Sequence, residues 1–392
     1  MAQKVRPGIR LVFVRELRRI VSRPIYLMMM VVLPLGSLFF FGTLMSDGLP
    51  EQLPIAVVDH DASSLSRKFI RQVEAGQQTK IVRNFSSFHE ARNAVQEREI
   101  FGFLELPENL MKDVTNGIQP TIHFYYTQGY LIPGSLVMKS MSYTFTTLSA
   151  GVNLQVRQAR GQGYTQAMAQ VLPISPEMHA LGNPWVNYAV YLNSVLLPGM
   201  LQLLVLLTTV YVIGLEIKKE RSLKWYRLSG RNLVKALVGK LLPYTIAFTL
   251  MGFIFCIAMY KVLHYPMHGN MGWMFLNYFT MVLAYQAMGI FLVEMFPTLP
   301  VALSISGLFG VLGVSYSGLS FPIDGMPLAM QGLSFLFPIR WFFKIYQGAA
   351  LNGLPPVHFF HFYLYQFAYL LFPFLLRKRF LHAVVKMDYP KY

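Results

Sequence analysis

Six long apolar runs dominate the sequence and leave few folds open to it. Five of them contain no Asp, Glu, Lys or Arg, and the sixth carries only His361: residues 26–45, 186–215, 241–260, 271–293, 301–321 and 359–376. An apolar helix of about 20 residues crosses a hydrocarbon core of roughly 30 Å. With 54% hydrophobic and 13% charged residues, the chain has the composition of a membrane protein. We therefore expect an α-helical integral membrane protein with six transmembrane helices, the first within residues 24–45.

The distribution of basic residues predicts how these helices are oriented. Residues 1–25, 216–240 and 377–392 together hold 20 Lys and Arg against four acidic residues, whereas 46–185 holds 11 basic and 12 acidic residues. Lys and Arg mark the cytoplasmic side of a membrane protein. Both termini and the loop 216–240 are thus expected in the cytoplasm, with 46–185 extracytoplasmic, in a bacterial cytoplasmic membrane. The net charge of +16 favours anionic lipids as partners and not nucleic acid.

Residues 46–185 have a different periodicity from the rest of the chain. Short apolar runs such as IAVVDHD and IFGFLELP alternate with amphipathic runs such as SSLSRKFIRQVEAG, which begins with serine and ends with glycine. Such alternation predicts an α/β domain with a partly parallel sheet. A long helix or a helix pair is expected from Pro133 to about Gln170, interrupted at Gly161 and Gly163. The membrane domain then continues through 186–392.

The chain has no motif of an enzyme or of a nucleotide-binding protein. No G-x-x-x-x-G-K-[ST] run, nucleophile elbow or zinc-binding helix occurs, so we expect no catalytic residue, no metal and no directly bound cofactor. Glu294, near the inner end of the fourth run, is a candidate gating residue. The alternative is a carboxylate that extends from the helix end to water.

The N-terminal residues 1–23 are predicted to include an amphipathic helix at the inner membrane surface. Within 8–23 the two faces differ sharply in polarity, with Ile9, Phe13, Leu17 and Ile20 on one face and Arg15, Arg18 and Arg19 on the other. A helix of this kind lies in the plane of the interface with its basic face toward anionic head groups.

Residues 322–356 are too apolar for a solvated loop, and their helical pieces are too short to cross the membrane. Pro and Gly residues divide the segment into pieces of about 12 residues, or about 18 Å as helix. A pair of re-entrant half-helices at the outer leaflet fits, and backbone at that depth lines a cavity or is buried in protein. The residues expected to shape an exit there are Pro322, Gly325, Pro327, Pro338, Arg340, Trp341, Gly348 and Gly353.

These features in this order resemble the permease subunits of type-2 ATP-binding-cassette exporters, in the branch with a large domain between the first two helices. The resemblance covers essentially the whole chain and is carried by residues 15–42, 55–74, 216–230 and 321–353. It implies that the loop after the second helix forms a coupling helix that docks on a separate ATPase. The residues matched to that role are Glu220, Arg221, Leu223, Lys224, Trp225 and Arg227. The chain lacks the family's loop glycine, and Lys224 stands where the family has a second acid.

The resemblance implies a half-transporter that pairs with a second permease copy or a paralogue and binds two ATPase subunits, which use ATP and magnesium. The expected cargo is a hydrophobic or amphiphilic compound, exported as in multidrug efflux. Export of a lipid-linked glycan or envelope component is one alternative, and a non-transporting anchor for the outer domain is another. A periplasmic adaptor and an outer-membrane channel are further candidate partners. Leu223 and Trp225 are expected to be apolar anchors for the ATPase, so Trp225→Ala is expected to uncouple a folded protein.

Overall fold

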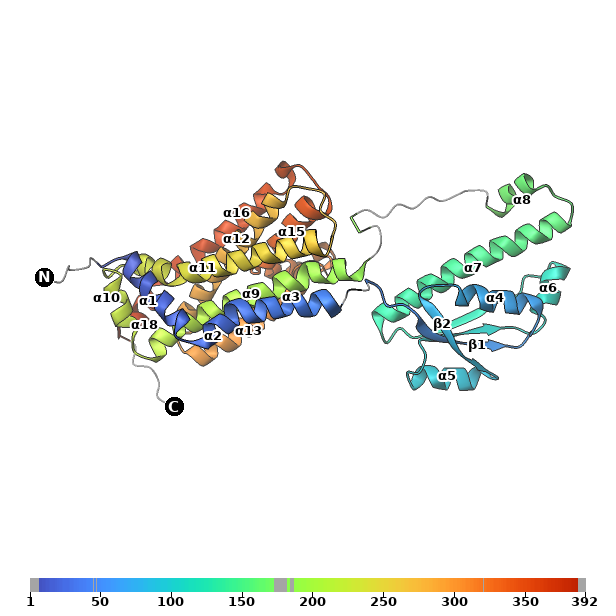
Figure 1. The fold of residues 1–392 in the computed structure, drawn as a ribbon, viewed down its shortest axis with the longest axis horizontal. Helices are drawn as coiled ribbons and strands as arrows, with labels where there is room; N and C mark the ends of the chain where they lie inside the picture. Colours follow the sequence, from blue (N-terminus) through green and yellow to red (C-terminus); the bar gives the residue numbers. More distant parts are fainter. Residues whose placement is uncertain are drawn as a thin grey trace. The chain divides into compact units, whose positions relative to one another are not determined.

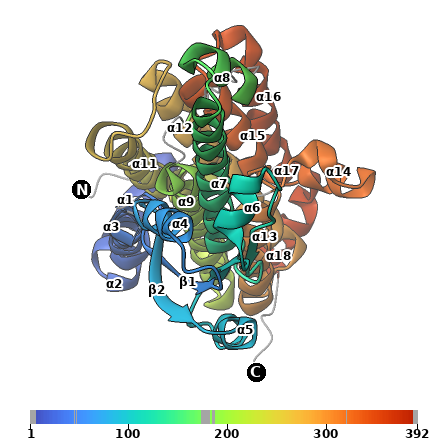
Figure 2. The ribbon, with the colours of Figure 1, turned by 90° about the vertical axis from the view of Figure 1, so that its right-hand side faces the viewer.

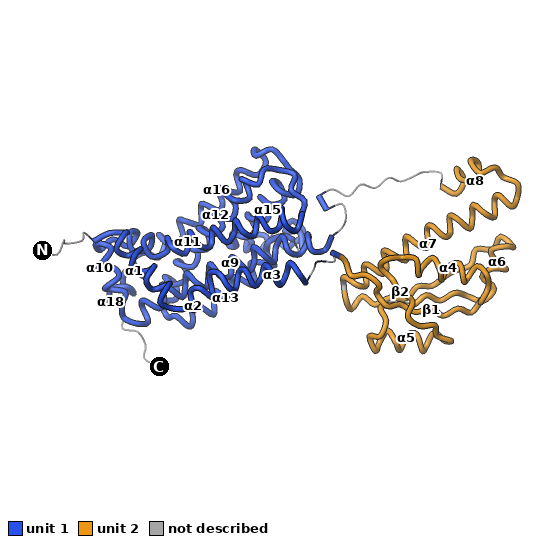
Figure 3. The backbone as a smooth tube through the Cα atoms, in the orientation of Figure 1, with its two compact units in different colours: residues 1–48, 180–392 blue, residues 49–179 orange. Residues whose placement is uncertain are grey.

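The chain forms two compact units in the computed structural model (Figures 1 and 3). The helical unit comprises Met1–Gly48 and Ala180–Tyr392, and the α/β unit comprises Leu49–His179. The structure describes residues 7–44, 46, 48–172, 182–183, 187–319 and 321–386. The part of the predicted outer domain at 173–181 and 184–185, and the first residue of the second predicted helix, lie outside the described residues.

The helical unit begins with a short helix and a first apolar segment, and the other helices follow the α/β insertion. Its elements are α1 (Ile9–Val21), α2 (Pro24–Leu27), η1 (Met28–Val32), α3 (Leu33–Leu44), α9 (Tyr188–Lys218), α10 (Ser222–Leu228), α11 (Leu233–Ile257), η2 (Ala258–Val262), α12 (Met271–Met295), α13 (Leu299–Ser315), η3 (Ile323–Gly325), α14 (Leu328–Ser334), α15 (Pro338–Tyr346), η4 (Gln347–Leu351), η5 (Pro356–His358), α16 (Phe360–Ala368), η6 (Tyr369–Leu371), α17 (Phe372–Leu375) and α18 (Arg377–Lys386).

Four helices of the described chain are long and apolar enough to cross a membrane: Pro24–Leu44, Tyr188–Lys218, Leu233–Val262 and Met271–Met295. Leu299–Ser315 is apolar but shorter. The sixth predicted helix is not continuous, because α16 gives way to the 3-10 turn η6 just before Pro373. Proline has no backbone N–H to continue the helical hydrogen bonds, which accounts for the break. The chain is thus a helical membrane protein with four or five apolar helices and an inserted α/β domain.

The connection between the second and third apolar helices is shorter than predicted. We expected a loop at 216–240, but α9 continues to Lys218 and α11 already begins at Leu233. The prediction ended the helices at charged residues. Lys240 is nevertheless fully buried inside α11, where acidic side chains neutralise it. A charge can lie within a helix at this depth when it is paired.

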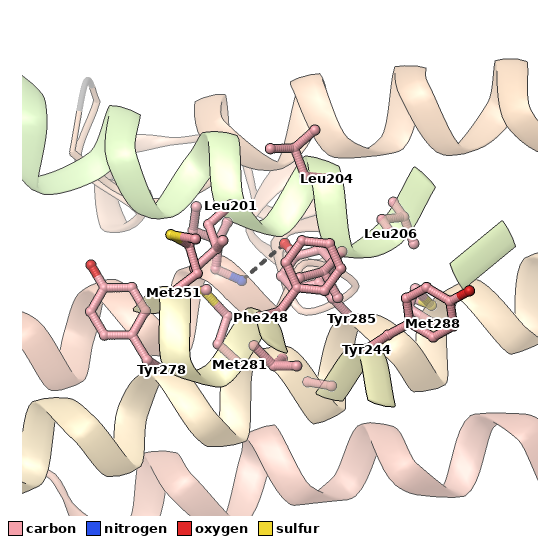
Figure 4. Close-up of a cluster of buried hydrophobic side chains, with 14 of the residues drawn as sticks. Leu201, Leu204, Leu206, Tyr244, Phe248, Met251, Tyr278, Met281, Tyr285 and Met288 are labelled. Atoms are coloured by element: carbon pink, nitrogen blue, oxygen red, sulfur yellow. Dashed lines mark hydrogen bonds between the residues drawn. The ribbon is translucent and has the colours of Figure 1, made fainter. Parts of the chain in front are cut away.

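The interior of the helical unit is built mainly by α9, α11 and α12. Figure 4 shows aromatic and sulfur-containing side chains of α11 and α12 packed together, among them Tyr244, Phe248, Met251, Tyr278, Met281 and Tyr285, with Leu201 of α9 beside them. Some polar groups in this interior bond to backbone atoms of a neighbouring helix. Gln202, for example, donates a hydrogen bond to the carbonyl of Gly310 in α13 (3.1 Å). These helices therefore form one contiguous core.

The α/β unit has the alternating order that its sequence predicts. Its elements are β1 (Leu53–Asp59), α4 (Ser64–Glu74), β2 (Thr79–Phe85), α5 (Phe88–Gln96), β3 (Gly102–Leu106), α6 (Leu110–Asn116), β4 (His123–Tyr126), α7 (Leu131–Ala159) and α8 (Tyr164–Val171). The strand order is β2-β1-β3-β4, with β1 parallel to β2 and β3 and with β4 antiparallel to β3. The prediction of a partly parallel sheet is confirmed.

Helices cover both faces of this sheet (Figures 1 and 2). Ile55 and Val57 of β1 pack with residues of α4, α6 and α7 on one face. Ala56 and Val58 of the same strand pack with α5 on the other face. Because successive side chains of a strand point to opposite faces, a strand that is apolar throughout must be covered on both sides. That rule explains the continuous apolar run at the start of the unit.

Residues 322–356 contain two main helical pieces. Some of their boundaries differ from the predicted ones. Helix α14 precedes Pro338, which begins α15, and the π-helical turn η4 extends α15 to Leu351. Gly348 lies inside η4 and does not end the piece. A Cβ at Gly348 would lie 3.0 Å from Cβ of Phe359, so this glycine allows the close approach of two segments.

Candidate functional site

Helix α10 is a short amphipathic helix at one end of the helical unit, where α1 and α18 also lie (Figure 1). Ser222, Trp225 and Ser229 are buried, at the spacing of one helical face. The other face carries the charges predicted for docking, and Glu220, Arg221, Lys224 and Arg227 are all exposed, while Leu223 is half-buried. The structure thus brings five of the six predicted coupling residues to the surface.

Hydrogen bonds fix the buried face of α10 to three other parts of the unit. The Trp225 indole donates to the carbonyl of Ala236 in α11 (3.1 Å), and the Ser222 hydroxyl donates to the carbonyl of Val384 in α18 (2.8 Å). The amide of Gly8, just before α1, donates to the carbonyl of Leu228 (3.0 Å). A displacement of α10 would therefore be transmitted to α1, α11 and α18.

Trp225 does not lie where the sequence analysis expected it. Its side chain is fully buried, so the prediction that it is an exposed anchor for a partner is wrong. The basic run around it suggested an exposed loop. The helical spacing, however, turns the tryptophan inward between charged residues that face out. Its ring also lies 5.6 Å from Nζ of Lys240, within the range of a cation–π contact.

A hollow of about 590 Å³ lies on the surface beside α10. It is lined by four of the predicted coupling residues, Glu220, Leu223, Lys224 and Arg227, together with Pro7, Leu11 and Leu228. Sequence reasoning missed Pro7 and Leu11, because they belong to a segment more than 200 residues earlier in the chain. Its walls combine leucine and proline with charges of both signs, a surface suited to a protein partner.

A buried cluster of charges lies beneath α10 and joins α1, α9 and α11. Glu16, Glu216 and Lys240 are each 1% exposed or less. Nζ of Lys240 donates to Oε2 of Glu16 (2.9 Å) and to Oε1 of Glu216 (3.0 Å). The Tyr244 hydroxyl donates to the other oxygen of Glu16 (2.9 Å). Every carboxylate in the cluster is therefore paired, as burial of a charge requires.

Two arginines of α1 complete this cluster. Arg15 donates to Oε2 of Glu216 (2.9 Å), and Arg19 also pairs with Glu216. Burial lowers the pKa of Arg19, but the carboxylates of Glu16 and Glu216 together raise it by more. The pKa of Arg19 therefore lies above its ordinary value. Both guanidinium groups hold α1 against the end of α9.

The cluster corrects the prediction for the N-terminal helix. Arg15 and Arg19 were expected to face lipid head groups, but they turn inward to Glu216, and only Arg18 of the three predicted arginines is exposed. Val12 and Glu16 are the buried residues of α1, whereas Ile9 and Leu17 of the predicted apolar face are exposed, so contact of that face with lipid stays a prediction. Packing is close here, since a Cβ at Gly239 of α11 would lie 2.8 Å from the carbonyl oxygen of Ile9.

A signal for the cluster does exist in the sequence. Glu16 and Glu216 are two of only four acidic residues in the three strongly basic segments. Two isolated carboxylates next to apolar runs need cationic partners, and Lys240 borders such a run as well. The sequence does not show which cation pairs with which carboxylate, because the partners lie on three different helices.

Glu294 is buried in α12 and does not extend to water, so that alternative is wrong. Within the described residues neither of its carboxylate oxygens has a hydrogen-bond partner. Its role in gating stays a prediction.

Among the described residues, no group of three His, Cys, Asp or Glu side chains could hold a metal ion.

The predicted exit residues lie in the segment around α14 and α15, apart from α10 (Figure 1). Pro322, Gly325 and Pro327 flank or end the 3-10 turn η3 and precede α14. Arg340 is buried, donates to the hydroxyl of Ser334, and lies 4.2 Å from the ring centroid of Phe335.

The other members of that set stabilise the same region. The Trp341 indole donates to the hydroxyl of Tyr369 (3.2 Å). Gly353 has a φ of +59°, in the left-handed region, and a Cβ there would lie 2.9 Å from Cβ of His268. These contacts describe a packed segment, and the role of its residues in an exit stays a prediction.

Comparison with known proteins adds two findings. The sequence model of a family described as "ABC-2 family transporter protein" matches residues 24–376, which is most of the chain. The linearmycin resistance permease protein LnrN of Bacillus subtilis (strain 168) is similar at 22% identity over 358 residues, covering 87% of this chain and 89% of that protein.

Proposed function

Because the chain belongs to the ABC-2 family of transporter proteins, we propose that α10 is the helix through which a separate ATPase drives this permease. Family membership makes the chain the membrane component of an ABC transporter and implies an ATPase partner that uses ATP. The observation that carries the proposal is the two-sided character of α10. One face offers charges and a hollow to a partner, and the other is bonded to α1, α11 and α18.

The orientation of the chain in the membrane follows from the charge distribution. With α10 and both termini in the cytoplasm, the α/β unit is extracytoplasmic, in a bacterial cytoplasmic membrane. Helix α13 and the broken helix α16–α17 then provide the fifth and sixth crossings, and α14 and α15 are re-entrant half-helices of the outer leaflet. Two permease copies, or one copy and a paralogue, bind two ATPase subunits that use ATP with magnesium.

The cargo is a hydrophobic or amphiphilic compound that is exported. Support comes from the similarity to LnrN, whose name describes a linearmycin resistance permease. ATP-driven closure of the two ATPase subunits would displace α10, and the buried charge cluster would carry that displacement to α1 and α9.

Reversal of charge on the exposed face of α10 tests this proposal. In the double variant Lys224→Glu and Arg227→Glu, two basic residues that line the hollow become acidic. We expect about tenfold or greater loss of ATPase binding, since misplaced charge at an interface costs several kcal/mol. Co-purification of the ATPase and export by intact cells measure the effect.

The matched control is Arg231→Glu, which changes an exposed arginine outside α10 that does not line the hollow. Both variants should unfold at the temperature of the unchanged protein, because all three side chains are exposed. Full ATPase binding and export by the double variant would overturn the assignment of α10.

A further inference from the structure

An apolar groove of about 530 Å³ runs along the outside of the helical unit, away from the hollow beside α10. Leucines of α11 and α12 form its walls, including Leu237, Leu242 and Leu283, and Phe374 of α17 closes one side. Its volume is in the range of pockets that hold small ligands. No residue of the predicted coupling or exit sets lines it.

The length of the groove corresponds to one leaflet of a bilayer. Along α11 it extends from Leu233 to Thr245, a rise of 12 residue steps or about 18 Å of helix. Half of a hydrocarbon core of roughly 30 Å is about 15 Å. A single acyl chain lying along α11 from its first turn would fill the groove.

One charged residue distinguishes the groove from an ordinary lipid-facing surface. Arg377, the first residue of α18, is exposed and is the one charged residue among those that line it. A guanidinium at the edge of an apolar groove attracts the anionic head group of a lipid whose chain lies in that groove.

We propose that this groove is a binding site for one anionic phospholipid. The phosphate pairs with the guanidinium of Arg377, and an acyl chain lies along the leucines of α11 and α12. A lipid held there joins α11, α12 and α18, independently of the proposed role of α10.

Selective retention of lipid by the purified full-length permease tests the site. The protein is reconstituted in phosphatidylcholine nanodiscs with a minor fraction of phosphatidylglycerol, then delipidated in detergent, and the retained lipids are measured by mass spectrometry. We expect the unchanged protein to retain phosphatidylglycerol over phosphatidylcholine. Arg377→Gln should reduce that preference about fivefold, which corresponds to about 1 kcal/mol for one arginine beside an anionic lipid.

Arg379→Gln is the matched control, because Arg379 is exposed on the same first turn of α18 and does not line the groove. Leu242→Trp should lower retention of both lipids by filling the groove. Equal retention of the two lipids by the unchanged protein would overturn the proposal, as would equal losses in the Arg377 and Arg379 variants. Undiminished retention by Leu242→Trp would also overturn it.

Discussion

Lys240 is the side chain on which the buried charge cluster depends most. Among the described residues it is the one cation that donates hydrogen bonds to both Glu16 and Glu216, and it is fully buried. Arg15 and Arg19 approach the cluster from one side and remain partly exposed. Without Lys240, Glu16 would keep a hydrogen bond from Tyr244 and a longer contact with Arg19 (3.8 Å).

Lys240→Met removes the ammonium and keeps the length of the side chain. Removal of one partner from a buried ion pair leaves a buried charge uncompensated and destabilises a protein by about 3–5 kcal/mol. We expect a lower unfolding temperature of the purified permease, measured by the loss of monodisperse protein on heating. Lys235→Met, an exposed lysine on the same helix, is the control and should unfold like the unchanged protein. Equal stability of the two variants would show that the cluster contributes nothing to the fold.

The charged residues of this cluster entered the sequence analysis only as counts, and the cluster itself was not predicted. Counting Lys and Arg assigned Lys240 and Glu216 to a loop, because a charge usually ends an apolar helix. A count of charges cannot show that Lys240 and Glu216 neutralise each other across two helices. Because they do, both helices can include these charged residues. The same limitation explains Arg15 and Arg19, whose direction depends on a carboxylate about 200 residues away.

Helix α10 is small, and its orientation depends on one aromatic ring. Trp225 is the largest of the fully buried side chains, and its indole reaches α11. Trp225→Ala would leave a cavity and free a carbonyl, and truncations of this kind cost about 3–5 kcal/mol. We therefore expect Trp225→Ala to destabilise the protein as well as to lower ATPase binding, which replaces the expectation of a folded, uncoupled variant. Thermal unfolding and ATPase co-purification measure the two effects.

Trp225→Phe separates packing from hydrogen bonding at this position. The phenyl ring keeps most of the buried surface but cannot donate to Ala236, so the loss of stability should be about 1 kcal/mol. ATPase binding should then stay close to that of the unchanged protein. Full stability and full binding by Trp225→Ala would contradict the view that the ring fixes α10.

Elements with a clear local pattern were predictable, and breaks that depend on packing were not. The α/β alternation was confirmed because apolar periodicity and serine caps are local, as at Ser63, whose hydroxyl accepts from two amides of α4. The first turn of α11 was missed because its charges looked like a loop. The continuous η4 turn depends on how Gly348 packs against Phe359, which composition alone does not reveal. The break in the sixth helix does have a local signal, Pro373, which the count of apolar residues ignored.

At the scale of the whole molecule, the α/β unit is inserted between two residues of the helical unit that lie side by side. The amide of Tyr188, the first residue of α9, donates to the carbonyl of Gly48 (2.8 Å). Each described apolar cluster contains residues of one unit only, so each unit has its own hydrophobic core. Adjacent ends and separate cores are the conditions under which an inserted domain can be removed.

Replacement of residues 49–186 by a short Gly–Ser linker should therefore leave the helical unit folded. We expect a monodisperse permease with an unfolding temperature close to that of the full chain, and with ATPase binding retained because α10 and its contacts are unchanged. The comparison is a chain that keeps the insertion but has 219–232 replaced by Gly–Ser of equal length, which should lose the ATPase. Export assays of the shortened protein then measure what the α/β unit contributes to transport. The shortened chain keeps Gly48 and Tyr188. If it nevertheless aggregates, the helical unit needs the insertion to fold and the two units are not independent.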